Sequence, residues 1–479
     1  MKLRLSSPIA LAAIIGLVVL VAGCVLTGRG GLLNLLYPLG ALLVGLLLYL
    51  RYPALYVGFV WWVWFLTPEV RRLVDYQSGY HDQSPVMLAP FLVTGLTFFT
   101  LLRHSPKLRA FPLLPFGLVI LGISYGYVVG FFKTGLSAVT FDLLGWLIPV
   151  IAAFHLVIRW RDYPDYRRVT QSTFLWGTLV MGSYGVLQFF NPPEWDRFWM
   201  RAVWPALNSI GNPEPFEVRV YSTLNSPGAF AEVIMAGLLL LSSGGFRGWL
   251  VGSVGYISFL LSLVRAAWGG WVVGVFSIAV YQGRFALRLL PVLTVTVLFM
   301  MPLLYVNPVS ETINDRLQTV FNLEQDTSLN ARSSLYSDFL PRLSSNVLGQ
   351  GLGSAGVAVY LETKGGEFSK YGTYPTDSAL ISVPLTLGWP GSLLYLGGLI
   401  MLVLRALRGK VGQDLFVAVS RGIVLAVLVQ LASAQVLTNV SGMIIWYFLG
   451  LLLATRMHQP VAKPATDRFQ TKVDKGNGE

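Results

Sequence analysis

Charged residues are scarce in this chain. They make up 12% of its 479 residues, whereas an average soluble domain has about 25%. The single cysteine, Cys24, excludes an intramolecular disulfide framework and a cysteine-cluster metal site. Histidines are few and scattered along the sequence, and no Asp-x-Asp pair occurs, so we expect neither a bound metal nor a metal-dependent nucleotide-sugar enzyme.

Apolar residues, by contrast, are abundant. They form 54% of the sequence, and the mean hydropathy is +0.62. A soluble core cannot bury so much apolar surface, so a lipid bilayer must be the solvent. Windows of about 17 to 25 apolar residues predict membrane-spanning helices. We predict an all-α polytopic integral membrane protein with 12–14 transmembrane helices, near 8–27, 32–50, 53–67, 86–102, 112–132, 138–158, 170–190, 226–243, 249–264, 267–282, 286–306, 379–404, 414–437 and 441–455.

The first of these windows contains the cysteine. Val21-Ala22-Gly23-Cys24 is similar to a lipoprotein cleavage site, but Val25 and Leu26 continue the apolar run. A cleaved signal is normally shorter and ends in polar residues. We therefore expect a first transmembrane helix here rather than a lipidated cysteine.

The charges between the windows predict an orientation. With the N-terminus inside, the cytoplasmic segments hold 22 of the 35 basic residues and six of the 23 acidic ones, whereas the opposite side holds 13 basic and 15 acidic residues. This is the positive-inside pattern, with both termini in the cytoplasm. The net charge of +12 therefore reflects membrane orientation, and we expect no nucleic-acid partner.

Three segments on the predicted outer side are long: 68–85, 191–225 and about 307–376. The predicted organisation is transmembrane helices in 1–306, a large periplasmic loop in 307–376, further transmembrane helices in 377–457 and a disordered cytoplasmic tail in 458–479. Within the large loop, apolar residues recur at helical spacing over Ser328 to Asn346, which predicts an amphipathic helix on the membrane face.

A glycine-rich stretch, 351–356, fits the G-x-G-x-x-G pattern of dinucleotide-binding sites. No strand is predicted before it, and it lies on the outer side, where nicotinamide cofactors are not supplied. A glycine turn that returns a loop helix to the membrane is the better interpretation, so we expect no cofactor.

Four charged residues lie in or beside predicted spans: Asp142, Glu232, Arg265 and Arg421. Charges at such positions are costly and are functional candidates by default. The first three lie toward the outer ends of their helices, whereas a proton-coupled transporter would place some near the midplane. Arg421 lies near an inner end, where snorkelling of its long side chain is a sufficient explanation.

Arg265 is the most informative of the four, because small residues surround it in the stretch from Ser262 to Gly270. Small residues let helices approach closely and would hold the guanidinium rigidly. A guanidinium fixed in this way can bind a diphosphate with two parallel hydrogen bonds. An arginine that anchors a helix end at the membrane interface is an equally good explanation.

Four stretches in order resemble motifs of one family. Arg219–Ala231 is similar to an Arg…Asn-Pro-Asn-x-Phe-Ala segment, with Ser226-Pro227-Gly228 in place of its central residues, and Ser262–Gly270 is similar to Ser-x-x-Arg-x-x-x-x-Gly. Asn330–Gly353 resembles a large-loop helix with its glycine-rich return, and Thr376–Gly391 resembles the segment that opens the next span. Together they resemble the superfamily of O-antigen ligases and O-antigen or exopolysaccharide polymerases, over about residues 140 to 400.

The resemblance implies metal-independent, inverting glycosyl transfer from a polyprenyl-diphosphate donor on the periplasmic side. Arg265 would bind the diphosphate, with Arg219 and Arg332 near it. Because a sugar hydroxyl is a weak nucleophile, a carboxylate is needed as general base, and Asp377 is the candidate. Asp377 also suits a helix N-cap.

Two further residues are predicted to contact the substrate. Glu232 is one of the costly outer charges. Tyr221 could stack on a sugar ring, although an aromatic residue of the membrane interface is an alternative account of it.

Ligases of this superfamily carry His-Asn eleven residues before a Gly-x-x-Gly, and eleven residues before Gly388 this chain has Asp377. An aspartate there is more similar to the repeat-unit polymerases. We therefore predict a bacterial inner-membrane polymerase of lipid-linked oligosaccharide repeat units. Its partners would be the polyprenyl-diphosphate-linked donor and acceptor, membrane lipids, and chain-length-regulating and export proteins.

Two other functions stay open. A ligase that passes glycan to a lipid or protein acceptor is the alternative within the superfamily. A transporter or flippase of lipid-linked sugars is the alternative of another class.

Overall fold

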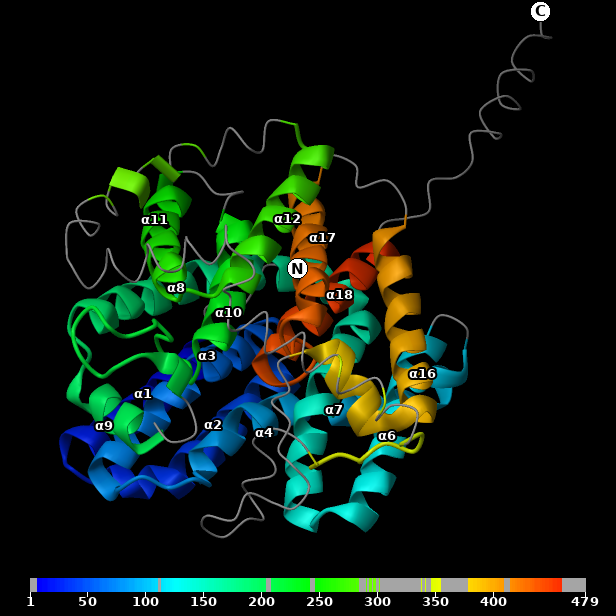
Figure 1. Cartoon of the computed structure of the whole chain (residues 1–479), viewed down its shortest axis with the longest axis horizontal. Helices are drawn as coiled ribbons and strands as arrows, with labels where there is room; N and C mark the ends of the chain where they lie inside the picture. The colour runs from blue at the N-terminus through cyan, green and yellow to red at the C-terminus, as the bar shows by residue number, and fades with distance from the viewer. Residues whose placement is uncertain are drawn as a thin grey trace, which may run out of the picture.

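The regular structure of the protein is helical. A computed structural model describes residues 7–110, 113–203, 208–241, 246–283, 346–354, 378–408 and 414–458, with a few positions between 290 and 341 (Figure 1). Within these residues β-structure is limited to the isolated bridge between Gly211 and Val218. The α-helices are α1 (Pro8–Leu26), α2 (Leu33–Arg51), α3 (Pro53–Ser78), α4 (Ala89–Gly95), α5 (Phe98–His104), α6 (Leu114–Lys133), α7 (Leu136–Ile158), α8 (Tyr163–Phe190), α9 (Glu194–Val203), α10 (Pro227–Leu241), α11 (Phe246–Leu261), α12 (Arg265–Tyr281), α16 (Ala379–Leu407), α17 (Leu415–Val429) and α18 (Asn439–His458).

Short 3₁₀ turns join several of these helices: η1 (Gly30–Leu32), η2 (Pro85–Leu88), η3 (Ser105–Arg109), η4 (Trp160–Asp162), η5 (Asn208–Ile210) and η9 (Gln430–Ala432). Eight helical segments of the described chain are long and apolar enough to cross a membrane. They are Pro8–Leu26, Gly30–Arg51, Pro85–Leu108, Leu114–Lys133, Leu136–Ile158, Ala379–Leu407, Leu415–Ala432 and Asn439–His458.

The chain is therefore an all-α polytopic membrane protein, as predicted. The predicted total of 12–14 spans stays a prediction, because most of the chain between 284 and 345 lies outside the described residues. The same holds for most of the large loop, with its amphipathic helix, and for the tail from 459 onward.

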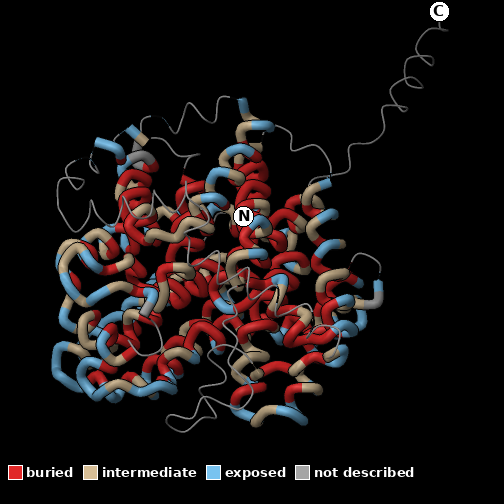
Figure 2. Tube along the Cα trace, in the orientation of Figure 1, coloured by how far each residue is buried: buried red, intermediate tan, exposed pale blue. Residues whose placement is uncertain are grey.

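The degree of burial differs strongly between the helices (Figure 2). Helix α18 is buried over nearly all its length, and its Trp446 and Phe448 are fully covered. Helix α1 is the opposite case, since apolar side chains such as Val18 and Val19 are about 60% exposed. An apolar helix with an exposed apolar surface is stable where lipid replaces water.

Helix α3 is longer than the sequence predicted. The apolar window ends near 67, and 68–85 was expected to be an outer segment, but the helix continues through Pro68 to Ser78. Its charged residues pair along the helix, Arg72 with Glu69 and Arg71 with Asp75. Pairs at i,i+3 and i,i+4 support a helix beyond the point where hydropathy falls.

Several helices meet at one end of the bundle, which we call the outer end because the charge pattern predicts that it faces the periplasm. There α6, α8, α11 and α17 end, and α7, α10, α12, α16 and α18 begin. Close glycine contacts fix the directions. Gly122 lies against Gly391 of α16 and Gly126 against Leu387, so α6 runs antiparallel to α16. Gly270 lies against Ala426 of α17 and Gly274 against Gly422, so α12 runs antiparallel to α17.

The glycine-rich segment 346–354 packs between α6 and α16. Gly349, Gly351 and Gly353 all have positive φ, near +80 to +88°. A Cβ on Gly351 would lie 2.2 Å from the backbone nitrogen of Gly130 in α6. The G-x-G spacing thus serves close backbone packing, as expected of a turn, while Gly356 of the same motif lies outside the described residues.

This segment also supplies hydrogen-bond partners where α16 is interrupted. Gly388 has φ 62° and ψ −176°, and Pro384 and Pro390 flank it, so the helix cannot continue its own hydrogen bonds there. The freed carbonyls of Leu385 and Thr386 accept hydrogen bonds from the backbone N–H groups of Gln350 and Gly351, at 2.8 and 2.9 Å.

Side chains of α6 and α7 bind further groups of the inserted backbone. Lys133 Nζ donates to the Gly349 carbonyl at 2.6 Å, and the Asp142 carboxylate accepts from Gly353 N–H at 2.9 Å. Asp142 is one of the costly charges found in the sequence, and this contact gives it a structural role. A polar group at membrane depth is tolerated when a partner is fixed beside it.

We expect Gly351→Ala to destabilise the protein by at least about 2–3 kcal/mol, because the new Cβ meets the α6 backbone and the residue must keep a positive φ. Gly397→Ala is the matched control, since nothing lies within 4 Å of its added Cβ in α16. That control should change stability by less than about 1 kcal/mol. Thermal unfolding of both variants in detergent tests this, and equal midpoints would contradict it.

Candidate functional site

Arg265 is the first residue of α12, at the outer end. The junction from α11 is only Ser262 to Val264, and Leu263 adopts φ 55° to make the turn. Its side chain is partly exposed. A cation at a helix N-terminus, where backbone N–H groups also point outward, provides two kinds of donor for an anion.

Arg219 reaches the same turn from the segment that precedes α10. Its Nη2 donates to the Leu263 carbonyl at 3.3 Å, and its Nη1 donates to the Ser209 carbonyl at 2.9 Å. The next residue, Val220, donates its N–H to Leu261 O at 3.2 Å. The structure thus brings two of the predicted arginines to one short stretch of chain.

Two predicted residues, Asp377 and Arg332, lie outside the described residues. The residue after Asp377 is described: Ser378 Oγ donates to Leu431 O at 3.3 Å, and Ala379 N–H donates to Ala434 O at 3.1 Å. Gly270 of α12 packs against the neighbouring Gln430. The start of α16 therefore contacts η9 and the residues just after it, while α12 contacts the last turn of α17 and the first residue of η9.

Glu232 is buried inside the helix bundle. Its side chain is 4% exposed in α10 and bonds to the Ser441 side chain of α18. One carboxylate oxygen, Oε2, has no partner among the described residues. Its predicted contact with substrate stays a prediction, because other side chains cover it here.

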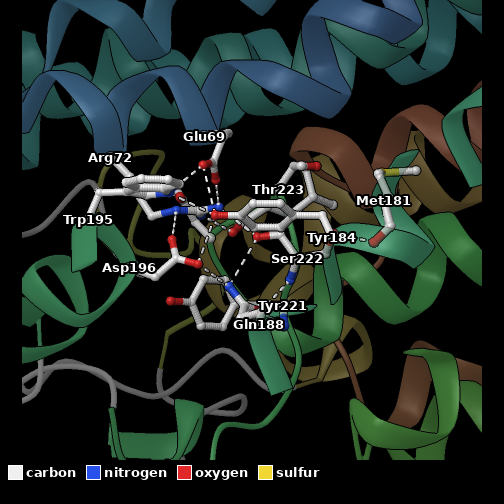
Figure 3. A network of polar contacts seen from close by, with 12 residues as sticks. Glu69, Arg72, Met181, Tyr184, Gln188, Trp195, Asp196, Tyr221, Ser222 and Thr223 are labelled. Atoms are coloured by element: carbon white, nitrogen blue, oxygen red, sulfur yellow. Dashed lines mark hydrogen bonds and ion pairs between the residues drawn. The ribbon is translucent and has the colours of Figure 1, made fainter. Parts of the chain in front are cut away.

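Tyr221 is fully buried as well, beside a cluster of polar residues that the sequence did not reveal (Figure 3). The Arg72 guanidinium lies 5.1 Å from the centre of its ring, and Trp199 packs beside it at 5.7 Å. A ring covered in this way is not open to a sugar. Burial raises the pKa of the Tyr221 hydroxyl well above its ordinary value, so the group stays protonated.

We call this set the Arg72 cluster: Glu69, Arg72, Tyr184, Gln188, Trp195 and Asp196. Arg72 is 0% exposed and lies between two carboxylates. Its Nη2 bonds to Glu69, and its Nε lies 2.7 Å from Asp196 Oδ1, an ion-pair contact without the direction of a hydrogen bond. The members come from α3, α8 and α9 and so join these three helices.

The Tyr184 hydroxyl lies between the same two carboxylates, 2.9 Å from Glu69 Oε1 and 3.0 Å from Asp196 Oδ2. A hydroxyl carries one proton and can donate to only one of them. Trp195 Nε1 also donates to Glu69 Oε1, at 2.8 Å. Burial raises the pKa of the Glu69 carboxyl above its ordinary value, although the Arg72 guanidinium beside it lowers that pKa.

A sequence signal for this cluster existed but was weak. Glu69 and Arg72 stand three residues apart and Asp196 lies in the next outer segment, so all three counted only as outer charges. The apolar neighbours Val70 and Val74 are the sign that this part of α3 is buried.

Neither a protein-family model nor a curated protein sequence matches this chain. The family resemblance therefore rests on the four motifs alone.

We expect Tyr221→Phe to leave stability within about 1 kcal/mol of the parent, because the buried hydroxyl has no partner among the described residues. Tyr221→Ala should cost about 3–5 kcal/mol, since it opens a cavity and exposes one face of Arg72. Thermal unfolding measures both changes. A large loss in Tyr221→Phe would mean that the hydroxyl has a partner beyond the described residues.

Proposed function

We propose that this protein is a glycosyltransferase that polymerises polyprenyl-diphosphate-linked oligosaccharide repeat units at the outer face of a bacterial inner membrane. The observation that carries the proposal is the bond from Arg219 to the Leu263 carbonyl. It places two arginines of separate family-like motifs at one turn, on a protein whose substrate would reach it through the bilayer.

The proposed chemistry needs few groups. The acceptor hydroxyl attacks the anomeric carbon of the donor sugar, and the bond from that carbon to the diphosphate oxygen breaks with inversion. Asp377 takes the hydroxyl proton, while Arg265 and Arg219 stabilise the charge on the departing diphosphate. Arg332 would add a further cation, and no metal is required.

The packing of α16 supports a role for Asp377. Ser378 and Ala379 follow it directly and contact Leu431 and Ala434, close to Gln430, which packs on α12. The base and the diphosphate-binding arginines would then approach the bond from neighbouring helix ends.

A flippase is less well supported. It would need polar groups along a path to the inner face, whereas Arg219 bonds to the turn that leads into Arg265 at the outer end. A ligase would use the same arginines, so only the product separates it from a polymerase.

We expect Arg265→Ala and Asp377→Asn each to lower the rate of chain elongation by about 100- to 1,000-fold. Arg201→Ala is the control, since Arg201 is an exposed arginine of α9 on the same predicted side. The assay is purified protein in liposomes with a lipid-linked oligosaccharide, and gels report product length. Elongation at the parent rate in either variant would remove that residue from the site.

Gene deletion separates the three functions. Loss of a polymerase leaves single repeat units attached to their final acceptor. Loss of a ligase leaves long chains on the polyprenyl carrier, and loss of a flippase leaves units facing the cytoplasm. Unchanged chain length in the mutant would refute the polymerase.

A further inference from the structure

We propose that Arg72 is a positioning residue for the transfer reaction: it fixes the segment 219–224 and thereby sets where the Arg219 guanidinium lies at the Arg265 turn. The effect on catalysis rests on the proposed function. The effect of Arg72 on the position of segment 219–224 can be measured independently of it.

The first step is the contact between Arg72 and this segment. Its Nη1 donates to the Leu224 carbonyl and its Nη2 to the Ser222 carbonyl. These residues are about 150 positions away in the chain. Backbone carbonyls inside an apolar bundle need partners, and here one side chain satisfies two of them.

The second step is that the N–H groups of the same segment are also bound. Gln188 Oε1 accepts from the N–H of Tyr221 at 3.1 Å and of Ser222 at 2.9 Å. Its Nε2 donates to Asp196 at 2.6 Å, and Asp196 in turn pairs with Arg72. Thr223 adds a bond from its hydroxyl to Phe65 O at 2.7 Å.

The backbone at Ser222 shows why so many contacts are needed. Its φ is 53°, a conformation that costs a non-glycine residue on the order of 1 kcal/mol or more. Its hydroxyl donates to Met181 O at 2.6 Å, which helps to keep it there. Without the surrounding bonds, this turn would relax.

The third step leads to Arg219, which is two residues before Tyr221. Its flanking residues, Val218 and Val220, are fully buried, and Val218 forms the bridge with Gly211. The backbone is therefore fixed on both sides of Arg219, by the bridge at Val218 before it and by the bonds to segment 219–224 after it. Arg219 reaches Leu263 O from this fixed position. A shift of about 1 Å in such a residue can cost about 100-fold in rate.

Lysine cannot replace Arg72 in this arrangement. The acceptors lie in different directions, with Asp196 at Nε, Leu224 at Nη1 and both Ser222 and Glu69 at Nη2. An ammonium group concentrates its donors at one atom and cannot span them. Arg72→Lys therefore keeps the charge and removes the fixed geometry.

The experiment compares Arg72→Lys with Arg71→Lys. Arg71 is the neighbouring buried arginine of α3, and it bonds to Asp75 and to His81 O instead of the segment 219–224. The background carries Cys24→Ser and a spin label on Glu217→Cys, an exposed position two residues before Arg219. Elongation is measured per folded molecule in liposomes.

In Arg72→Lys we expect the label to become more mobile and kcat to fall about 10- to 100-fold, with KM changed less than about threefold. Arg71→Lys should leave label mobility and kcat unchanged. A purely structural role for Arg72 would lower only the yield of folded protein, with kcat per folded molecule and label mobility as in the parent, and that result would overturn the proposal.

Gln188→Met is the second variant, because it removes the bonds to Tyr221 and Ser222 without leaving an unpaired buried charge. If Arg72→Lys does not fold, the same mobility increase and loss of kcat are expected in Gln188→Met, and their absence overturns the inference. If the parent protein does not elongate chains, the proposed function fails, whereas the label still tests whether Arg72 positions the segment.

Discussion

Inside a bilayer, every backbone N–H and C=O group must find its partner within the protein, and the rest of this fold depends on that constraint. Helix α16 breaks at Gly388, and segment 346–354 supplies the missing donors and finds further partners in α6 and α7. The break and the insertion are therefore one feature. Neither would be stable in lipid without the other.

The charged side chains of the Arg72 cluster likewise find their partners within the protein. A lone buried guanidinium would be very costly, yet Arg72 has two carboxyl groups, two carbonyls and two aromatic rings around it. Its bonds reach chain segments that lie far apart in the sequence. A buried ion pair adds little net stability in general, but it can specify one arrangement of the chain. In this protein, that arrangement includes the contact of Arg219 with Leu263, in the turn before Arg265.

The sequence was sufficient to predict the features that depend on hydropathy and on glycine spacing. The all-α membrane fold, the short junction before Arg265 and the turn-forming role of Gly351 and Gly353 could all be predicted, because each depends on local composition. The extension of α3 to Ser78 could not, since its charges look like an outer loop until Glu69, Arg72 and Asp196 are seen to pair. Partners so distant in sequence leave no local pattern, and the burial of Tyr221 and Glu232 was missed for the same reason.

The insertion of 346–354 has a consequence for biosynthesis. Tyr125 of α6 bonds to the Leu348 carbonyl, 223 residues further along the chain. When α6 enters the membrane, the backbone that fills its glycine-lined side has not yet been made. Contacts between such distant segments form late and slowly. Until translation reaches α16, lipid or a membrane-resident chaperone must cover the surface around Gly126 and Gly130.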